Sequence, residues 1–199
     1  MGLERIPGQD KGTKRPDREA VTFHPQARPI IKDSGSLPMT LADYNQAVDL
    51  HADGLYRFAL KHLRDRDSAK DIVQESFARL WAKVTEVDAA KAKSYLFTTA
   101  HHAMVDAVRK DGRSTRMEEH HTNLRSVDQA APDLKEVLDA ALATLPAIQR
   151  SVVLLRDLEG YSYDEIAELT GLNLAQVKVY IYRGRTALKD YIGQLDLIL

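Results

Sequence analysis

The chain has 199 residues, 44% of them hydrophobic, which is enough for one soluble domain or two small ones. It has no cysteine, which excludes disulfides, a thiol nucleophile and a thiolate zinc site. Its 28 lysines and arginines nearly balance 29 acidic residues, so bulk charge does not support tight DNA binding by the chain alone. No apolar run is long enough to span a membrane and the N-terminus has no signal-peptide core, so we expect a cytoplasmic protein without membrane contact of its own.

The first 39 residues are predicted to be a disordered extension. They hold five of the seven prolines, mixed charges and no helical or strand period. Thr40 and Asp43 then form a plausible N-terminal cap for a helix that should continue to Leu63.

A second helix is predicted to begin at Asp67, because apolar residues then recur at helical spacing. They are Ala69, Ile72, Val73, Phe77, Leu80, Trp81 and Val84. Thr85–Lys93 is expected to be a polar loop. Ser94 should open a third helix that ends near Gly112 and is buried through Phe97, Ala100, Met104 and Val108. Residues 40–111 are thus predicted to form a first domain.

The polar stretch 112–133 has no period and is predicted to be a flexible linker to a second domain, 134–199. Leu134–Leu145 should be helical, Pro146 suits the first position of another helix, and Gly160 should end that helix. No segment alternates as a strand does. The predicted fold class is therefore all-α, with two small helical domains.

The second domain carries the signature of a helix-turn-helix. Ser162 and Glu165 have the spacing of a capping box, and Gly171 should end the short helix that follows. Asn173 and Gln176 offer a second cap, after which one apolar stripe is expected to be buried. It consists of Leu174, Val177, Ile181, Gly184, Leu188 and Ile192.

The opposite face of that last helix is suited to the major groove of DNA. It presents Ala175, Gln176, Val179, Tyr182 and Arg183, flanked by Lys178, Tyr180 and Arg185. Amides and guanidinium groups read base edges, and apolar groups meet thymine methyls. A basic face alone is more often a solvated surface, but two capped helices joined by a glycine turn favour DNA binding.

Two further faces are candidates for binding. On the second helix the residues left outside the apolar stripe are Lys70, Asp71, Gln74, Glu75 and Ala78. On the third helix the residues opposite Phe97 and Met104 are Tyr95, Thr98, Thr99, His102, Asp106, Arg109 and Lys110. Rings, hydroxyls and cations in this arrangement suit single-stranded DNA. From pattern alone, a solvated surface is the favoured interpretation for the face of the second helix. For the face of the third helix, solvation, with Asp106 paired to Lys110, and DNA binding are equally good interpretations.

Both halves of the chain, over about residues 41–192, resemble an extracytoplasmic-function sigma factor of bacterial RNA polymerase. In the first domain the similar residues are Asp71-Ile72-Val73-Gln74-Glu75, Phe77, Leu80 and Trp81, then Tyr95-Leu96-Phe97, Asp106 and Arg109. In the second they are Leu145-Pro146, Arg150, Tyr163, Glu165-Ile166-Ala167, Gly171, Val177-Lys178 and Arg183-Gly184-Arg185.

The resemblance implies an alternative sigma factor that binds core RNA polymerase and promoter DNA, without a cofactor, a metal or bond chemistry of its own. Polymerase contacts are expected at Asp71, Gln74 and Glu75. Downstream-element contacts and strand opening are expected at Tyr95, Thr98, Thr99, His102, Arg109 and Lys110. Upstream-element contacts are expected at Gln176, Lys178, Val179, Tyr180, Arg183 and Arg185. An anti-sigma protein, which often restrains such factors, is a further implied partner, and the bound form should be associated with the nucleoid.

The sequence departs from the family pattern at positions that should alter promoter preference. Tyr95 stands where the family usually has Trp, and His102 where it often has Asn. The common run G-T-V-K-S-R-L reads Ala175-Gln176-Val177-Lys178-Val179-Tyr180-Ile181. We therefore expect preserved docking on polymerase and a different promoter sequence.

Two other classes of protein were weighed against this interpretation. A free-standing helix-turn-helix regulator would bind a palindrome as a dimer. An enzyme could use His102 with Asp106, but no nucleophile motif or phosphate-cradling loop accompanies them. His101 and His102 point ~100° apart on a helix, so they are poorly placed to share one metal ion.

Overall fold

The computed structural model describes residues 38–114 and 133–195, and it gives only the backbone for 110–114 and 195. Within these ranges the chain forms seven α-helices, one 3-10 turn and no strand. The first group is α1 (Leu41–Leu63), α2 (Arg66–Ala82), the turn η1 (Ala89–Lys91) and α3 (Ala92–Ser114). The second group is α4 (Leu134–Thr144), α5 (Ala147–Asp157), α6 (Tyr163–Thr170) and α7 (Leu174–Leu195). The all-α prediction with two helical regions is confirmed.

Local capping fixes where α1 and α2 begin. The Thr40 hydroxyl accepts the backbone N–H of Asp43 at 3.2 Å, and the Asp43 carboxylate accepts that of Thr40 at 2.8 Å, so the predicted cap of α1 is confirmed. The prediction that Asp67 caps α2 is wrong. Arg64 ends α1 in the left-handed conformation (φ 62°), and Asp65 directly after it is extended and accepts the N–H of Ser68 at 2.8 Å.

The connection between α2 and α3 is more ordered than the predicted polar loop Thr85–Lys93. Val87 lies in the core, and the Asp88 carboxylate accepts the N–H of Ala90 at 2.9 Å to cap the 3-10 turn. This turn leads directly into α3 at Ala92, two residues before the predicted start at Ser94. The burial of Val87 among the helices explains why a segment that is polar in sequence does not loop outward.

Residue boundaries also differ at the edges of the two groups. Met39, assigned to the extension, is buried in the core, whereas residues 1–37 lie outside the described part of the chain. The helix α3 continues to Ser114, so residues 112–114 are helical and not linker. Pro146 occupies the N-cap of α5 instead of its first turn, and α5 ends at Asp157, with Gly160 (φ 77°) in the turn beyond.

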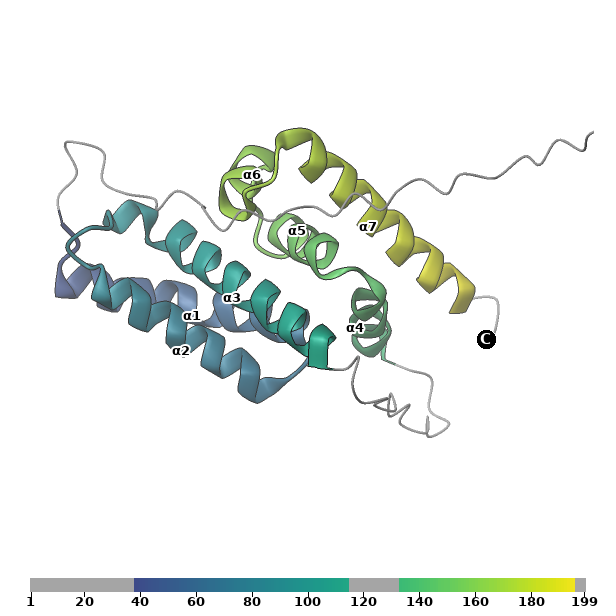
Figure 1. Ribbon diagram of the computed structural model, residues 1–199, viewed down its shortest axis with the longest axis horizontal. Coiled ribbons are helices and arrows are strands. Elements are labelled where there is room, and N and C mark those ends of the chain that lie inside the picture. The colour runs from purple at the N-terminus through teal and green to yellow at the C-terminus, as the bar shows by residue number, and fades with distance from the viewer. Residues whose placement is uncertain (1–37, 115–132, 196–199) are drawn as a thin grey trace, which may run out of the picture.

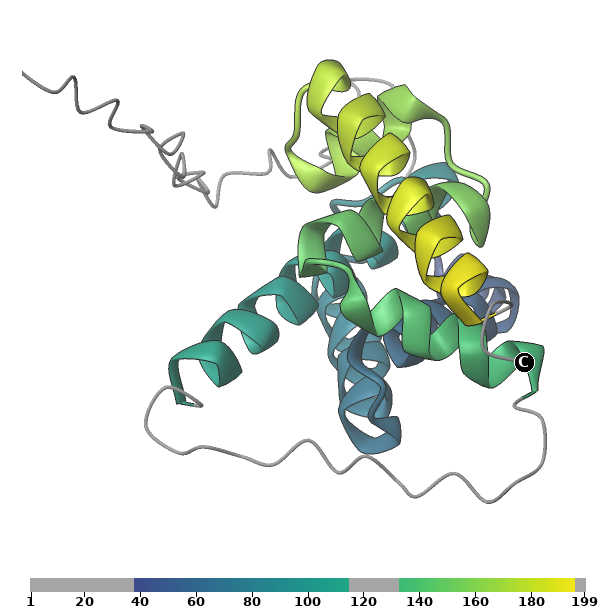
Figure 2. The same ribbon diagram turned by 90° about the vertical axis from the view of Figure 1, so that its right-hand side faces the viewer.

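The cores of both groups follow the predicted apolar stripes. The largest fully buried side chains include Phe58, Phe97, Leu55, Leu80, Leu96 and Met104 in the first group and Leu155, Ile166 and Ile181 in the second. Three residues predicted to be buried are instead exposed by more than a third: Trp81, Val108 and Leu174. Leu174 is the first residue of α7, Trp81 lies at the end of α2, and Val108 lies in the C-terminal part of α3. Figure 2 shows the C-terminal part of α3 projecting away from the other helices.

The two groups pack against each other, so that α4, α5 and α6 contact α1 and α3. In Figure 1 α5 lies between α3 and α7, and α2 and α7 form opposite outer edges of the molecule. Buried residues of both groups form one continuous hydrophobic cluster. The outward faces of α2 and α7 are therefore presented on different sides.

Candidate nucleic-acid and polymerase interface

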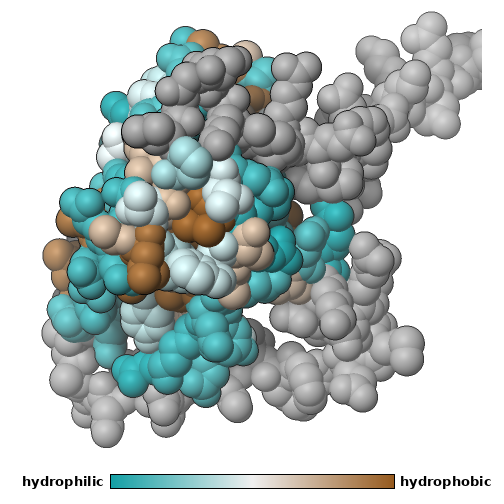
Figure 3. All heavy atoms as spheres, turned by 90° about the vertical axis from the view of Figure 1, so that its left-hand side faces the viewer, coloured by the Kyte–Doolittle hydropathy of each residue, from teal (hydrophilic) through white to brown (hydrophobic). Residues whose placement is uncertain are grey.

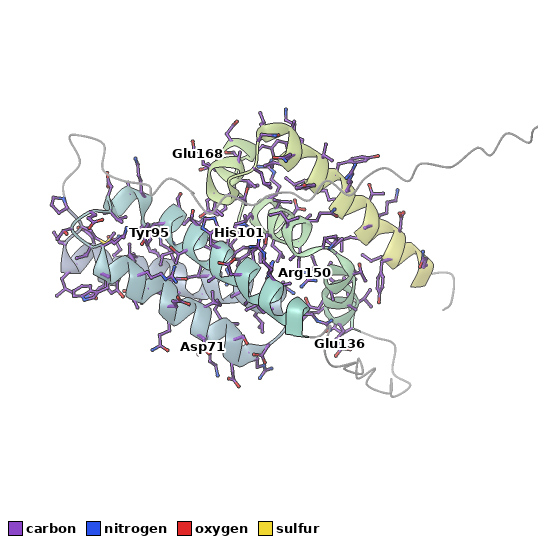
Figure 4. The ribbon with its side chains drawn as sticks, in the orientation of Figure 1. Asp71, Tyr95, His101, Glu136, Arg150 and Glu168 are labelled. Carbon is purple, nitrogen blue, oxygen red and sulfur yellow. The ribbon has the colours of Figure 1, made fainter. Side chains whose placement is uncertain are left out.

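The outward face of α2 is built by a helix that buries its other side. Asp71, Gln74 and Glu75 are all exposed, whereas Ile72 and Phe77 are buried. Figure 4 shows Asp71 on the outer edge of α2, directed away from α4–α7. The three side chains predicted to contact a partner thus share one accessible surface, and Glu75 is paired with Arg79 at 2.5 Å along it.

Apolar surface continues beside this face at the end of the molecule where α1 begins and α2 ends. Trp81 is 47% exposed and packs edge-on against Tyr44, with ring centroids 5.0 Å apart. Leu41 at the start of α1 is 62% exposed. Figure 3 looks onto this end and shows hydrophobic surface between hydrophilic side chains.

The predicted strand-opening face of α3 is only partly exposed. Thr99 is buried and its hydroxyl donates to the carbonyl of Tyr95 at 2.8 Å, so its assignment to an outward face is wrong. Thr98 has a buried hydroxyl, and Tyr95 and His102 are half-buried. The cause is packing on both sides, because α3 contacts α1 and α2 on one side and α5 and α6 on another.

The C-terminal half of α3 remains open to solvent. Asp106 and Arg109 are exposed, and Oδ1 of Asp106 lies 3.9 Å from Nη1 of Arg109, three positions further along α3. The side chain of Lys110 lies outside the described residues. The accessible part of this face is therefore Arg109, Asp106 and the exposed portions of His102 and Tyr95.

Two buried histidines lie between the helix groups. His101 is fully buried, and neither ring nitrogen has a hydrogen-bond partner. Burial, with His102 and His62 nearby, lowers the pKa of His101 to about 3. Burial and the Arg150 charge lower the pKa of His62 to about 4, and its Nε2 lies 3.2 Å from the carbonyl of Ala147. Both rings are neutral at pH 7, and within the described ranges no three potential metal ligands gather.

The helix-turn-helix forms as its sequence signals predict. The Ser162 hydroxyl accepts the N–H of Glu165 at 3.2 Å, and the Glu165 carboxylate accepts that of Ser162 at 2.7 Å. Gly171 ends α6 at φ 72°. Asn173 and Gln176 then cap each other at 2.8 and 3.0 Å, which starts α7 at Leu174. These caps fix the direction of α7 relative to α6.

The six predicted upstream-reading residues fall into two sets. Lys178, Val179 and Arg183 are exposed and face outward, together with Tyr182, which is 72% exposed. The others are engaged by the protein itself: Gln176 caps α7, Tyr180 is half-buried against the core, and Arg185 forms an ion pair with Asp157 of α5. The accessible reading surface is therefore narrower than the sequence indicated.

Arg150 has a structural role that pattern analysis of the residues did not reveal. Its guanidinium donates to the carbonyls of Leu142 (2.8 Å), Ala143 (2.9 Å) and Leu145 (3.0 Å) at the end of α4. It also donates to the carbonyl of His62 at 2.5 Å, at the end of α1. One cation thus satisfies free carbonyls at two helix ends and ties the two groups together. Figure 4 shows Arg150 in this position between them.

The turn between α5 and α6 makes the second connection between the groups. Lys93 of α3 lies 4.7 Å from the ring centroid of Tyr161 and donates to the carbonyl of Glu159 at 3.4 Å. The rings of Phe97 and Tyr161 meet edge-on at 5.6 Å. These partners are 64 to 68 positions apart, and no local pattern marks them as partners.

Comparison with known proteins identifies both halves of the chain. Residues 47–114 match the model of sigma-70 region 2, and residues 135–188 match that of sigma-70 region 4. The chain therefore has the two helical regions that define sigma-70-type factors. None of the described helices has a stretch that is long and apolar enough to span a bilayer.

Individual relatives narrow the class. The chain is 30% identical over 176 residues to the ECF RNA polymerase sigma factor SigL of Mycobacterium tuberculosis, covering 84% of this chain and 99% of SigL. It is 31% identical over 171 residues to SigE of Mycolicibacterium smegmatis, covering 81% of this chain and 65% of SigE. A solved complex of the sigma factor RpoE with the anti-sigma factor NepR from Bartonella quintana matches with a TM-score of 0.64 at 25% identity, over 77% of this chain and 98% of RpoE. The chain belongs to the ECF family of RNA polymerase sigma factors.

Proposed function

We propose that three separate surfaces of this chain carry out the three binding functions of an alternative sigma factor. The outward face of α2 binds core RNA polymerase through Asp71, Gln74 and Glu75. The exposed side of α7 reads the upstream promoter element, and α3 acts in opening the downstream element. The observation that carries this proposal is that α2 and α7 present separate, accessible faces on opposite edges of one compact molecule. A single chain can therefore hold polymerase and DNA at once.

Polymerase docking is tested by the double variant Gln74→Ala, Glu75→Ala. Both side chains lie outside the core, so helical content should not change while co-purification with core polymerase weakens. The matched control is Gln46→Ala, Asp49→Ala on α1, which also removes one exposed amide and one exposed carboxylate. Equal retention of both variants by core polymerase would refute the α2 interface.

For the upstream element, the exposed residues Lys178, Val179 and Arg183 are the proposed contacts. Gln176, Tyr180 and Arg185 act by shaping and supporting α7, since each is already held by protein contacts. A lost base contact changes the preference at one position and costs about 1 to 3 kcal/mol. Promoter selection with Arg183→Ala should therefore differ from the parent at one position, and an identical profile would exclude Arg183 as a reader.

For strand opening, the proposed contacts are Tyr95, His102 and Arg109, with Thr98 and Thr99 in supporting positions. Stacking on an aromatic ring contributes about 1 to 3 kcal/mol per base, which offsets much of the cost of unpairing one base. Tyr95→Ala and Arg109→Ala should impair initiation on duplex promoters more than on templates opened beforehand. Equal loss on both templates would indicate general loss of DNA affinity or of folding.

The proposal extends to organisation and control. We assign residues 40–111, extended by Met39 and by the end of α3 at Ser114, to one domain and residues 134–199 to a second. We expect the chain to act in the cytoplasm, associated with the nucleoid when it is bound to polymerase. The complex of RpoE with the anti-sigma factor NepR supports an anti-sigma protein as a further partner. The free-standing regulator is disfavoured because both matched regions are those of sigma factors.

A further inference from the structure

A groove lies between the start of α6 and the exposed side of α7. It has a volume of about 300 Å³. Tyr163 of α6 and the buried Ile181 line it, and about three turns of α7 supply the rest of the lining: Lys178, Tyr182, Arg185, Thr186 and Lys189. Lys178, Tyr182 and Arg185 belong to the predicted DNA-facing side of α7, whereas Tyr163, Thr186 and Lys189 have no role in the proposed reading of bases.

The charge of the groove is positive and largely uncompensated. No acidic side chain lines it. Lys178 and Lys189 are exposed, and in the described part of the chain neither forms an ion pair. Arg185 is held by the Asp157 carboxylate of α5, with Nε 3.1 Å from one oxygen. Two free ammonium groups therefore flank one guanidinium whose charge is already balanced.

The spacing of these cations favours an extended polyanion as the ligand. Lys178 and Lys189 are eleven positions apart, which is ~16 Å along a helix, with Arg185 between them. A single small anion can contact only one end of such a row. Duplex DNA carries a phosphate charge about every 1.7 Å of its axis, and so can meet both ends at once.

The walls of the groove are held in place before any ligand binds. The Arg156 guanidinium lies 4.9 Å from the ring centroid of Tyr163, and the Thr186 hydroxyl donates to the carbonyl of Tyr182 at 3.0 Å. Tyr182 and Lys178 also belong to the outward reading side of α7. DNA that seats its bases against α7 would therefore bring its backbone to this groove.

We propose that the groove between α6 and α7 binds backbone phosphates of the promoter duplex through Lys178 and Lys189. The ion pair with Asp157 keeps Arg185 from making a third phosphate contact. This inference rests on the proposed reading of DNA by α7: of the three proposed upstream contacts, Lys178 gives affinity through a phosphate, whereas Val179 and Arg183 give sequence preference. Loss of a phosphate contact weakens binding to all sequences alike, and it also reduces the dependence of affinity on salt.

The test measures binding of the full chain with core polymerase to an upstream-element duplex and to a scrambled duplex over a range of salt. Lys189→Gln should weaken binding to both duplexes by the same factor and reduce the slope of log affinity against log salt by about 0.9. Asp157→Asn should strengthen binding to both, because it releases Arg185. The matched control is Lys135→Gln, an exposed lysine of α4 away from the groove, which should change neither quantity.

The outcomes distinguish this inference from the proposed function. If the parent binds the upstream duplex selectively but Lys189→Gln leaves the salt slope unchanged, the phosphate groove is refuted while α7 remains the reader. If Lys189→Gln instead weakens binding to core polymerase in the absence of DNA, the groove holds an acidic protein segment and the inference is overturned. If the parent shows no preference for any duplex, the proposed function itself fails.

Discussion

Gly184 gives the sharpest test of how α7 is positioned. It lies on the buried side of α7, facing α5, and a Cβ at this position would lie 2.6 Å from Cγ2 of Val153 and 3.7 Å from Cδ1 of Leu145. Carbon atoms in contact are normally 3.5 to 4.0 Å apart, so α7 would have to move by roughly 1 Å. Val153 is only 3% exposed and cannot turn aside into solvent.

The expected effect of Gly184→Ala is a net loss of about 1 to 2 kcal/mol in the free energy of unfolding. Overpacking a core costs about 1 to 3 kcal/mol, and the higher helix propensity of alanine offsets up to about 1 kcal/mol of that. Because the displaced element is α7, reading of the upstream element should weaken as well. The matched control is Gly193→Ala in the same helix, where a Cβ meets nothing within 4 Å and stability should be unchanged or slightly higher.

The assay is urea unfolding followed by far-ultraviolet circular dichroism, arranged as a double-mutant cycle with Val153→Ala. Removing the valine methyl groups removes the clash, so Gly184→Ala should become neutral or stabilising in that background. The same destabilisation in both backgrounds, or none in either, would refute close α5–α7 packing as its cause.

Three further predictions concern stability. The free energy of unfolding should fall as the pH drops below about 6.5, because the folded pKa values of His62 and His101, about 4 and 3, keep both rings neutral in the folded state. Each histidine should contribute a slope of up to about 1.4 kcal/mol per pH unit. His101→Leu should flatten the dependence of the free energy of unfolding on pH, and an unchanged dependence would contradict this role of His101. Ser162→Ala should lower the free energy of unfolding by about 1 kcal/mol in urea, because the cap of α6 is lost, and an unchanged value would contradict this role. Arg150→Lys should destabilise by more than 1 kcal/mol, since a lysine cannot serve four carbonyls, and parental stability would show that these bonds contribute nothing.

The parts of the fold that could be predicted from the sequence are those set by interactions between residues three or four positions apart. The caps of α1, α6 and α7 each involve residues three positions apart, so their residue types alone specify them. The start of α2 was misplaced because Asp65 and Asp67 are equally good caps in sequence. The left-handed conformation of Arg64 decides between them, and only the structure reveals it.

Burial depends on contacts that sequence periodicity does not encode. Val87 stands in a segment that is polar in sequence, and Thr99 falls on the face of α3 predicted to point outward. Both side chains are nevertheless buried. The connections through Arg150, Lys93 and Tyr161 join residues far apart in the chain and leave no period to detect. For the same reason, the sequence anticipated the exposure of Lys178, Val179 and Arg183 on α7 but not the ion pair between Arg185 and Asp157.

Run-off transcription with core RNA polymerase on fragments of the source genome tests the central claim most directly. The account predicts that adding the chain produces discrete promoter-specific transcripts that core polymerase alone does not make. These transcripts should weaken with Gln74→Ala, Glu75→Ala and persist with Gln46→Ala, Asp49→Ala. An identical set of transcripts with and without the chain, together with binding of the chain alone to palindromic duplexes, would contradict the account and favour a free-standing regulator.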